Sequence, residues 1–245
     1  MESFKEYIEN GDSSMKKEKY MDAIRSYTTA YNSINEESDE KAEVCYKLSQ
    51  SYFALEPKNI ENPMKYAQES MQIHEKLNEN DLKVMDLVNM GYINLDSGKR
   101  DQSLKYFEEA IELSEKIKDI QLIAMTNNAK AEALSSLKSK YSEAMAIYDK
   151  VITMTEKSTD WDNYFEAIYG KLNIMRNRDL NEAFDTGKAA LDKVDQIMNT
   201  IKTKKEKKEF KSSLGYIYDI TSDIAMELEN IDEAMKIAAR SKDQA

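Results

Sequence analysis

The stretch "NMGYINLDSGKRDQSLKYFEEAIEL" (residues 89–113) decides the fold class of this chain. It contains two amphipathic segments separated by a short polar turn around Gly98. Gly91 lies inside the first segment, where a glycine costs about 0.5–1 kcal/mol relative to alanine, so we expect it to mark a close crossing of two helices. We expect Gly98 to end the first helix in the left-handed conformation that glycine readily adopts.

The same stretch contains two glycines, the second followed by Lys99, and these residue types also occur in phosphate-binding loops. Such a loop has four residues between its glycines and a serine or threonine after the lysine. Here six residues separate Gly91 from Gly98, and Arg100 follows the lysine. No apolar strand precedes the stretch, so it predicts helix packing and argues against a nucleotide site.

The composition also favours an all-helical fold. The chain of 245 residues has only six glycines and two prolines, whereas strand-rich domains need many turns built from Gly, Pro, Asn and Asp. Its longest apolar runs span a few residues, such as "LIAM" (122–125), far fewer than the about 20 that a transmembrane helix needs. We therefore expect an all-α protein without a membrane segment.

Charge and cysteine content restrict the partners and the compartment. The net charge of −11 disfavours nucleic acid, whose affinity for proteins rests on neutralised phosphates. Cys45 is the only cysteine, so no intrachain disulfide can form and a reducing, cytoplasmic compartment is expected. The first residues, "MESFKEYIENGD", contain no apolar signal segment.

The pattern of the opening stretch recurs along the chain at a spacing of roughly 36–50 residues. Each unit has a small residue inside a first helix and an alanine-like residue inside a second, as in Leu87-x2-Met90-Gly91 followed by Ser103-x3-Phe107. Small residues at a crossing let two helices approach closely, and aromatic rings fill the space beside them. The predicted units are residues 4–37, 40–78, 82–118, 120–157, 160–200 and 205–245.

These units resemble the tetratricopeptide repeat (TPR), which has a Leu-Gly pair between aromatics on helix A and Ala-x3-aromatic on helix B. The motif tryptophan is missing, since Trp161 lies outside the pattern, and the spacing exceeds the basic 34 residues. In both respects the chain is similar to the long-repeat TPRs of kinesin light chains and of bacterial peptide receptors of the Rap type. The resemblance implies a single all-α domain over residues 1–245, a TPR-like right-handed α-solenoid of about six antiparallel helix pairs.

Two segments depart from the regular pattern. The Pro-containing loop "EPKNIENP" (56–63) is interpreted as a lengthened turn, with Pro63 in the first turn of the next helix. Residues 181–228 contain few helix breakers, and we expect two long helices there, joined near the lysine run "NTIKTKKEKKE" (199–209). In the last unit, Ser222 and Ala234 are expected to meet where the two helices cross.

The sequence predicts no catalytic or metal site and no cofactor. His74 is the only histidine, and one histidine without neighbouring ligands cannot build a metal site. We expect it to be a packed or half-exposed, neutral side chain. No nucleophile elbow such as G-x-S-x-G is present, and the lysines of 202–211 are interpreted as solvating a helix end.

The resemblance further implies that helix A of each unit lines a concave groove. Aromatic side chains there can hold a peptide, and asparagine amides can bond its backbone; the alternative is that these side chains pack against the next repeat. The candidate binding residues on this face are Tyr46, Gln50, Phe53, Met85, Asn89, Tyr92, Asn127, Lys130, Tyr164 and Lys171.

The function expected from the sequence is a non-enzymatic scaffold or adaptor that binds a protein or peptide segment. Three alternatives stay open: a peptide-sensing regulator, a hydrolase on a helical scaffold, and a structural subunit that works through its edges. Because no extra polar helix follows the last unit to cap the array, self-association through the C-terminal helix, or a partner domain there, is also expected.

Overall fold

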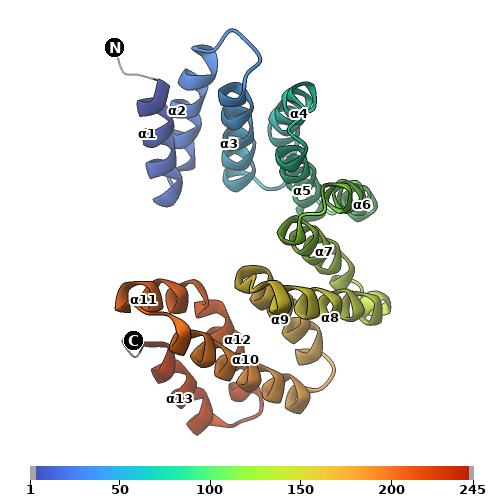
Figure 1. Cartoon of the computed structure of the whole chain (residues 1–245), viewed down its shortest axis with the longest axis vertical. Helices are drawn as coiled ribbons and strands as arrows, with labels where there is room; N and C mark the ends of the chain where they lie inside the picture. The colour runs from blue at the N-terminus through green and yellow to red at the C-terminus, as the bar shows by residue number, and fades with distance from the viewer. Residues whose placement is uncertain (1–3, 243–245) are drawn as a thin grey trace. The chain divides into compact units, whose positions relative to one another are not determined.

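The structure, a computed structural model, describes residues 4–242. Over that range it is all-α, with one short 3-10 helix (Lys138–Lys140) and no strand (Figure 1). The chain divides into two compact units between Ala133 and Leu134. The predicted all-α, TPR-like fold is confirmed.

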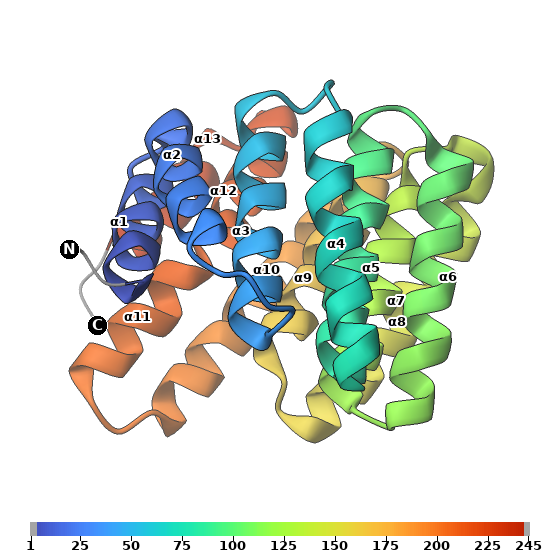
Figure 2. The ribbon, with the colours of Figure 1, turned by 90° about the horizontal axis from the view of Figure 1, so that it is seen from above.

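Unit 1 consists of consecutive helices that pack on their neighbours in chain order (Figure 2). Its first core, shared by the first four helices, surrounds Tyr27 and Leu48, and its second core surrounds Met90 and Phe107. The helices are α1 (Phe4–Lys16), α2 (Tyr20–Asn32), α3 (Asp39–Leu55), α4 (Glu61–Leu77), α5 (Asn80–Asp96), α6 (Arg100–Ile117) and α7 (Ile120–Ser135), the last of which runs across the division.

The opening stretch forms α5, the turn and α6 as expected. Gly98 has φ +79°, the left-handed conformation that ends α5. Gly91 faces the fully buried ring of Phe107, so close that a Cβ at this position would overlap the ring. Gly11 meets Tyr27 of α2 in the same way. The small residue and the aromatic of each of these pairs therefore fit together as one packing contact.

Replacing Gly91 by alanine should lower the free energy of unfolding by about 1–3 kcal/mol, because the added methyl group overpacks the contact with Phe107. Helix propensity alone would favour alanine by about 1 kcal/mol. Gly215→Ala is the matched control: it begins a helix and nothing lies near an added Cβ. Urea denaturation followed by circular dichroism measures both, and equal stability of the two variants would contradict the packing role of Gly91.

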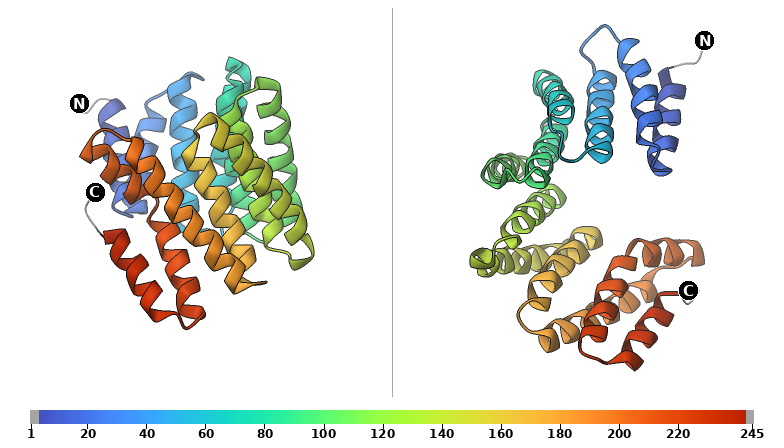
Figure 3. Two further views of the ribbon diagram at one scale, coloured as in Figure 1. Left: turned by 60° about the horizontal axis from the view of Figure 1, so that its bottom comes forward. Right: turned by 180° about the vertical axis from the view of Figure 1, so that it is seen from behind.

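Unit 2 is built around one large apolar core. Figure 3 shows the course of its helices. Helices that follow one another in the chain pack together in this unit. The exception is α10, which packs more extensively on α12 than on the short helix α11 that lies between them in the chain. Its helices are α8 (Tyr141–Ser158), α9 (Trp161–Arg176), α10 (Leu180–Thr200), α11 (Lys204–Ser213), α12 (Gly215–Glu227) and α13 (Ile231–Lys242).

The expectation of two long helices over residues 181–228 is wrong, since three helices lie there. Thr203 caps α11: its Oγ1 accepts a hydrogen bond from the backbone N–H of Glu206 and donates one to the Glu206 carboxylate. The Thr203 side chain therefore acts as the N-cap that starts a new helix. Buried Leu214 (φ −101°, ψ 14°) then separates α11 from α12.

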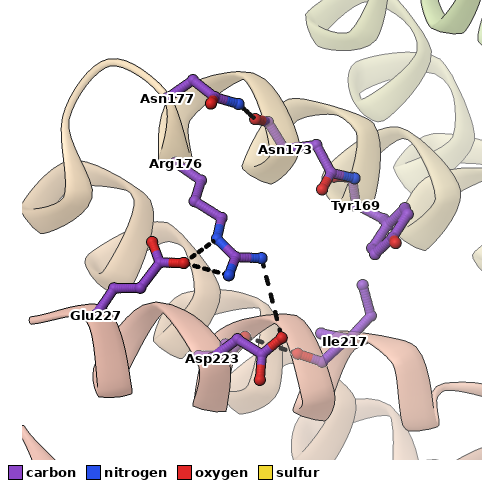
Figure 4. A network of polar contacts seen from close by, with 8 residues as sticks. Tyr169, Asn173, Arg176, Asn177, Ile217, Asp223 and Glu227 are labelled. Atoms are coloured by element: carbon purple, nitrogen blue, oxygen red, sulfur yellow. Dashed lines mark hydrogen bonds and ion pairs between the residues drawn. The ribbon is translucent and has the colours of Figure 1, made fainter.

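The last pair of helices meets at the predicted crossing. Ser222 Oγ of α12 donates a hydrogen bond of 3.2 Å to the backbone oxygen of Ala234 in α13. A polar network also joins α12 to α9 (Figure 4). In it, the guanidinium group of Arg176 donates to Glu227 and lies 3.9 Å from Asp223. α12 and α13 thus form the last helix pair, and α12 rather than the extra helix α11 makes the polar contact with α9 of the preceding pair.

Candidate functional site

A pocket of about 420 Å³ lies in unit 1, formed by α3, α4 and α5. Its volume falls within the range of about 300–1,000 Å³ that ligand pockets have. Two predicted binding residues line it together, Tyr46 from helix A of the second predicted unit and Met85 from helix A of the third. The complete lining is Asp39, Glu40, Glu43, Tyr46, His74, Leu82 and Met85.

Helix ends position most of these side chains. The Oγ of Ser38 accepts a hydrogen bond from Lys41 N and caps α3, so Asp39 and Glu40 occupy its first turn, where negative charge is favoured. α4 ends with Asn78 in the left-handed conformation (φ 61°). The turn to α5 is therefore short, and it brings His74 at the end of α4 close to Asp86.

His74 and Asp86 form a buried pair beside the pocket. His74 Nδ1 donates to Asp86 Oδ2 over 2.6 Å, and His74 Nε2 lies 3.9 Å from Glu79 Oε2. Burial alone would lower the pKa of His74, but the hydrogen bond to Asp86 and the nearby carboxylates outweigh it and raise that pKa. Burial raises the pKa of Asp86. His74 is packed, as predicted, but its environment favours the charged imidazole over the expected neutral form.

Both predicted asparagines use their amides inside the fold. Asn89 Nδ2 donates to Ser49 Oγ over 2.8 Å and so links α5 to α3. Asn127 Nδ2 donates to the backbone oxygen of Ile123, one turn earlier in α7. Both side chains are buried. The amide of Asn89 thus packs between repeats, as in the alternative interpretation, whereas that of Asn127 bonds within its own helix.

The other predicted residues are dispersed. Tyr92 packs its ring edge on Phe107 (5.2 Å between centroids) and donates its hydroxyl to Glu132. Tyr164 is buried against Trp161 and Phe165. The side chains of the remaining four residues, Gln50, Phe53, Lys130 and Lys171, are half-buried or exposed. Both lysines form an ion pair with a carboxylate of the preceding helix, Lys130 with Glu108 and Lys171 with Asp149.

Sequence reasoning missed the acidic side of the pocket. Asp39, Glu40 and Glu43 precede Tyr46 by one and two turns of α3, and Leu82 precedes Met85 by one turn of α5. Extending the helix A face toward the N-terminus of each helix would have found them. The role of His74 had no comparable signal, because it depends on the turn after α4.

The only cysteine of the chain, Cys45, is buried. Burial raises the pKa of the Cys45 thiol to about 12, so it stays protonated and is a poor nucleophile. Within residues 4–242, no three His, Cys, Asp or Glu side chains are grouped so as to hold a metal ion. Over the same residues, none of the helices is both long and apolar enough for a membrane span.

The paired helices and their small-to-aromatic crossings define an α-helical repeat protein of the tetratricopeptide class. A profile of the family described as Iml2/Tetratricopeptide repeat protein 39 matches residues 83–213. This is more than half of the chain, which therefore belongs to this family. Among curated protein sequences, none matches it.

Solved structures with the same fold support this class. The apo form of RapI is 17% identical with a TM-score of 0.66, covering 98% of this chain and 97% of that one. A Rap protein complexed with competence and sporulation factor is also 17% identical, with a TM-score of 0.62 over 97% and 73% of the two chains. A putative kinesin light chain from Podosopora anserina is 11% identical, with a TM-score of 0.59 over 76% and 93%. These similarities show the fold and confirm both predicted resemblances.

Proposed function

We propose that this chain is a non-enzymatic scaffold that binds a peptide or protein segment on the helix A face of unit 1. The observation that carries the proposal is the pocket lined by Tyr46 of α3 and Met85 of α5, helices A of two successive predicted units. Aromatic and thioether side chains offer adaptable apolar contact to a bound segment. The similar Rap structure with competence and sporulation factor gives further support for a binding role.

The non-enzymatic part of the proposal rests on how the reactive groups are used. His74 is held by Asp86, and the Cys45 thiol is buried inside the core of α1–α4. A nucleophile needs a base within hydrogen-bond reach, and neither group offers that arrangement. A cytoplasmic location and self-association through the last helix stay predictions.

The proposal predicts which variant loses its partners in a pull-down from native lysate with mass spectrometry. Wild-type protein and the control variant Met21→Ala, changed at an exposed position of α2 outside the pocket lining, should retain the same proteins or peptides. The double variant Tyr46→Ala/Met85→Ala should lose them, because it removes the apolar wall of the pocket. Thermal unfolding confirms that all three are folded. Equal retention by all three, or no retained protein together with turnover of a small molecule, would overturn the proposal.

A further inference from the structure

The carboxylates of the pocket gather on one side of it. Asp39, Glu40 and Glu43 lie on the first turns of α3, and the apolar Tyr46, Leu82 and Met85 complete the lining. The pKa of Glu40 is lowered by a backbone hydrogen bond and by the Ser38 hydroxyl, so this carboxyl is ionised at neutral pH. The pocket thus combines negative charge with apolar surface.

Neighbouring lysines neutralise this charge only in part: Lys47 forms an ion pair with Glu43, and the other partners of these lysines lie outside the lining. Lys41 Nζ donates to the backbone oxygens of Tyr31 and Ile34, beyond the end of α2. Lys47 lies 3.6 Å from Glu43, but it approaches Asp12 of α1 more closely, at 2.8 Å. The two lysines nearest in sequence to His74 and Leu82 pair away from the lining: Lys76 with Glu37 and Lys83 with Glu75.

Two polar groups of the lining have hydrogen-bonding capacity left. His74 is 5% exposed, and its Nε2 has no hydrogen-bond partner among the described residues, with Glu79 at 3.9 Å. The Tyr46 hydroxyl likewise has none within the described part of the chain, and burial raises its pKa, so it keeps its proton. A backbone carbonyl of an occupant can accept from either group. A peptide meets this need, whereas a simple organic cation does not.

We propose that the pocket binds a peptide segment in which a lysine or arginine side chain lies next to an apolar one. This inference rests on the proposed function and names the chemistry of its partner. The basic side chain pairs with the carboxylates of α3, and its apolar neighbour packs against Tyr46, Leu82 and Met85. Complementary charge chiefly sets specificity and the rate of association, while the apolar contact supplies burial.

A displayed library of random heptapeptides, selected on the immobilised full chain, tests the inference. Two triple variants with the same change in net charge are compared with wild type. Asp39→Asn/Glu40→Gln/Glu43→Gln removes the charge of the pocket. Glu109→Gln/Glu112→Gln/Glu115→Gln removes three exposed carboxylates of α6, none of which lines the pocket, and controls for general attraction to an acidic protein.

Wild type and the α6 variant should enrich peptides that pair Lys or Arg with a large apolar residue, and the pocket variant should not. For an enriched peptide, the dissociation constant should rise about tenfold or more in the pocket variant and less than about threefold in the control. Equal weakening in both variants would overturn the inference. Enrichment of peptides without basic residues, with binding lost in Tyr46→Ala/Met85→Ala, would overturn it while the proposed function stands. No enrichment at all would contradict both.

Discussion

Phe107→Ala is expected to lower the free energy of unfolding by about 3–5 kcal/mol, because it removes a fully buried aromatic ring and leaves a cavity. The ring packs on Gly91 and lies 5.2 Å, centroid to centroid, from the ring of Tyr92. It also belongs to the core that α4, α5, α6 and α7 share. Urea denaturation followed by circular dichroism measures the loss.

Tyr106→Ala provides the matched control on the same helix. Tyr106 is only partly buried at the edge of this core, so its truncation should cost less than half as much. A double variant adds a sharper test: in Phe107→Ala/Gly91→Ala the new methyl group enters the vacated space, so the two changes should be less than additive. Strict additivity, or equal losses for Tyr106 and Phe107, would show that the Gly91–Phe107 contact is not the packing unit of this repeat.

The pairing of Gly91 with Phe107 also shows why the fold could be predicted from the sequence. A small residue and an aromatic, at fixed positions of two neighbouring helices, report a close helix crossing wherever they recur. Local backbone chemistry was equally readable, since Gly98 adopts the expected left-handed conformation and Pro63 lies in the first turn of α4. Each of these signals acts over a few residues or across one helix pair.

Helix α11 shows where this reasoning failed. The apolar spacing of residues 181–228 is compatible with continuous helices, and the lysine run indicated only one interruption. The N-cap at Thr203 was present in the sequence as T-K-K-E, the spacing that is typical of a helix start. The turn at buried Leu214 had a weaker signal, Gly215 at the start of α12, because a lone glycine is also tolerated inside a helix.

The sequence could predict which helix face carries the candidate site, but not which side chains on that face are accessible. The resemblance to TPR units implies that Tyr46 and Met85 lie on the helix A face, and the structure brings them into one pocket. The same resemblance does not tell whether a side chain on that face is open or covered by the next helix. Asn89 is covered and bonded to Ser49, since α3 and α5 approach each other there. That distinction depends on the neighbouring unit, which a single repeat does not encode.

The second large expected change in stability concerns the buried pair of His74 and Asp86 beside the pocket. His74→Ala should lower the free energy of unfolding by about 3–5 kcal/mol at neutral pH, because it leaves the buried Asp86 carboxylate with only the Ser70 hydroxyl to stabilise its charge. Asp86 is fully buried, and its Oδ1 has no hydrogen-bond partner among the described residues. The loss is measured by urea denaturation at several pH values.

The pH dependence follows from the direction of each pKa shift. In wild type the raised pKa of His74 gives stability that is fully present below about pH 6.5 and is lost as the pH rises through the folded-state value. In His74→Ala, burial raises the pKa of Asp86 without an opposing imidazole. The variant therefore keeps its stability only below the unfolded carboxyl value of about 3.9, and loses it as the pH rises through the folded-state pKa of Asp86.

The double variant His74→Ala/Asp86→Asn separates charge from packing. An amide cannot ionise, so the double variant should lack the pH-dependent loss and should be more stable than His74→Ala at about pH 8. His74 is the only histidine of the chain, so its imidazole signal in an NMR titration is unambiguous and should report a pKa above about 6.5. An equal loss in His74→Ala at about pH 5 and about pH 8, or a histidine pKa at or below the ordinary value, would mean that the pair is held by shape alone. The charge on the imidazole would then contribute nothing to the link between α4 and α5.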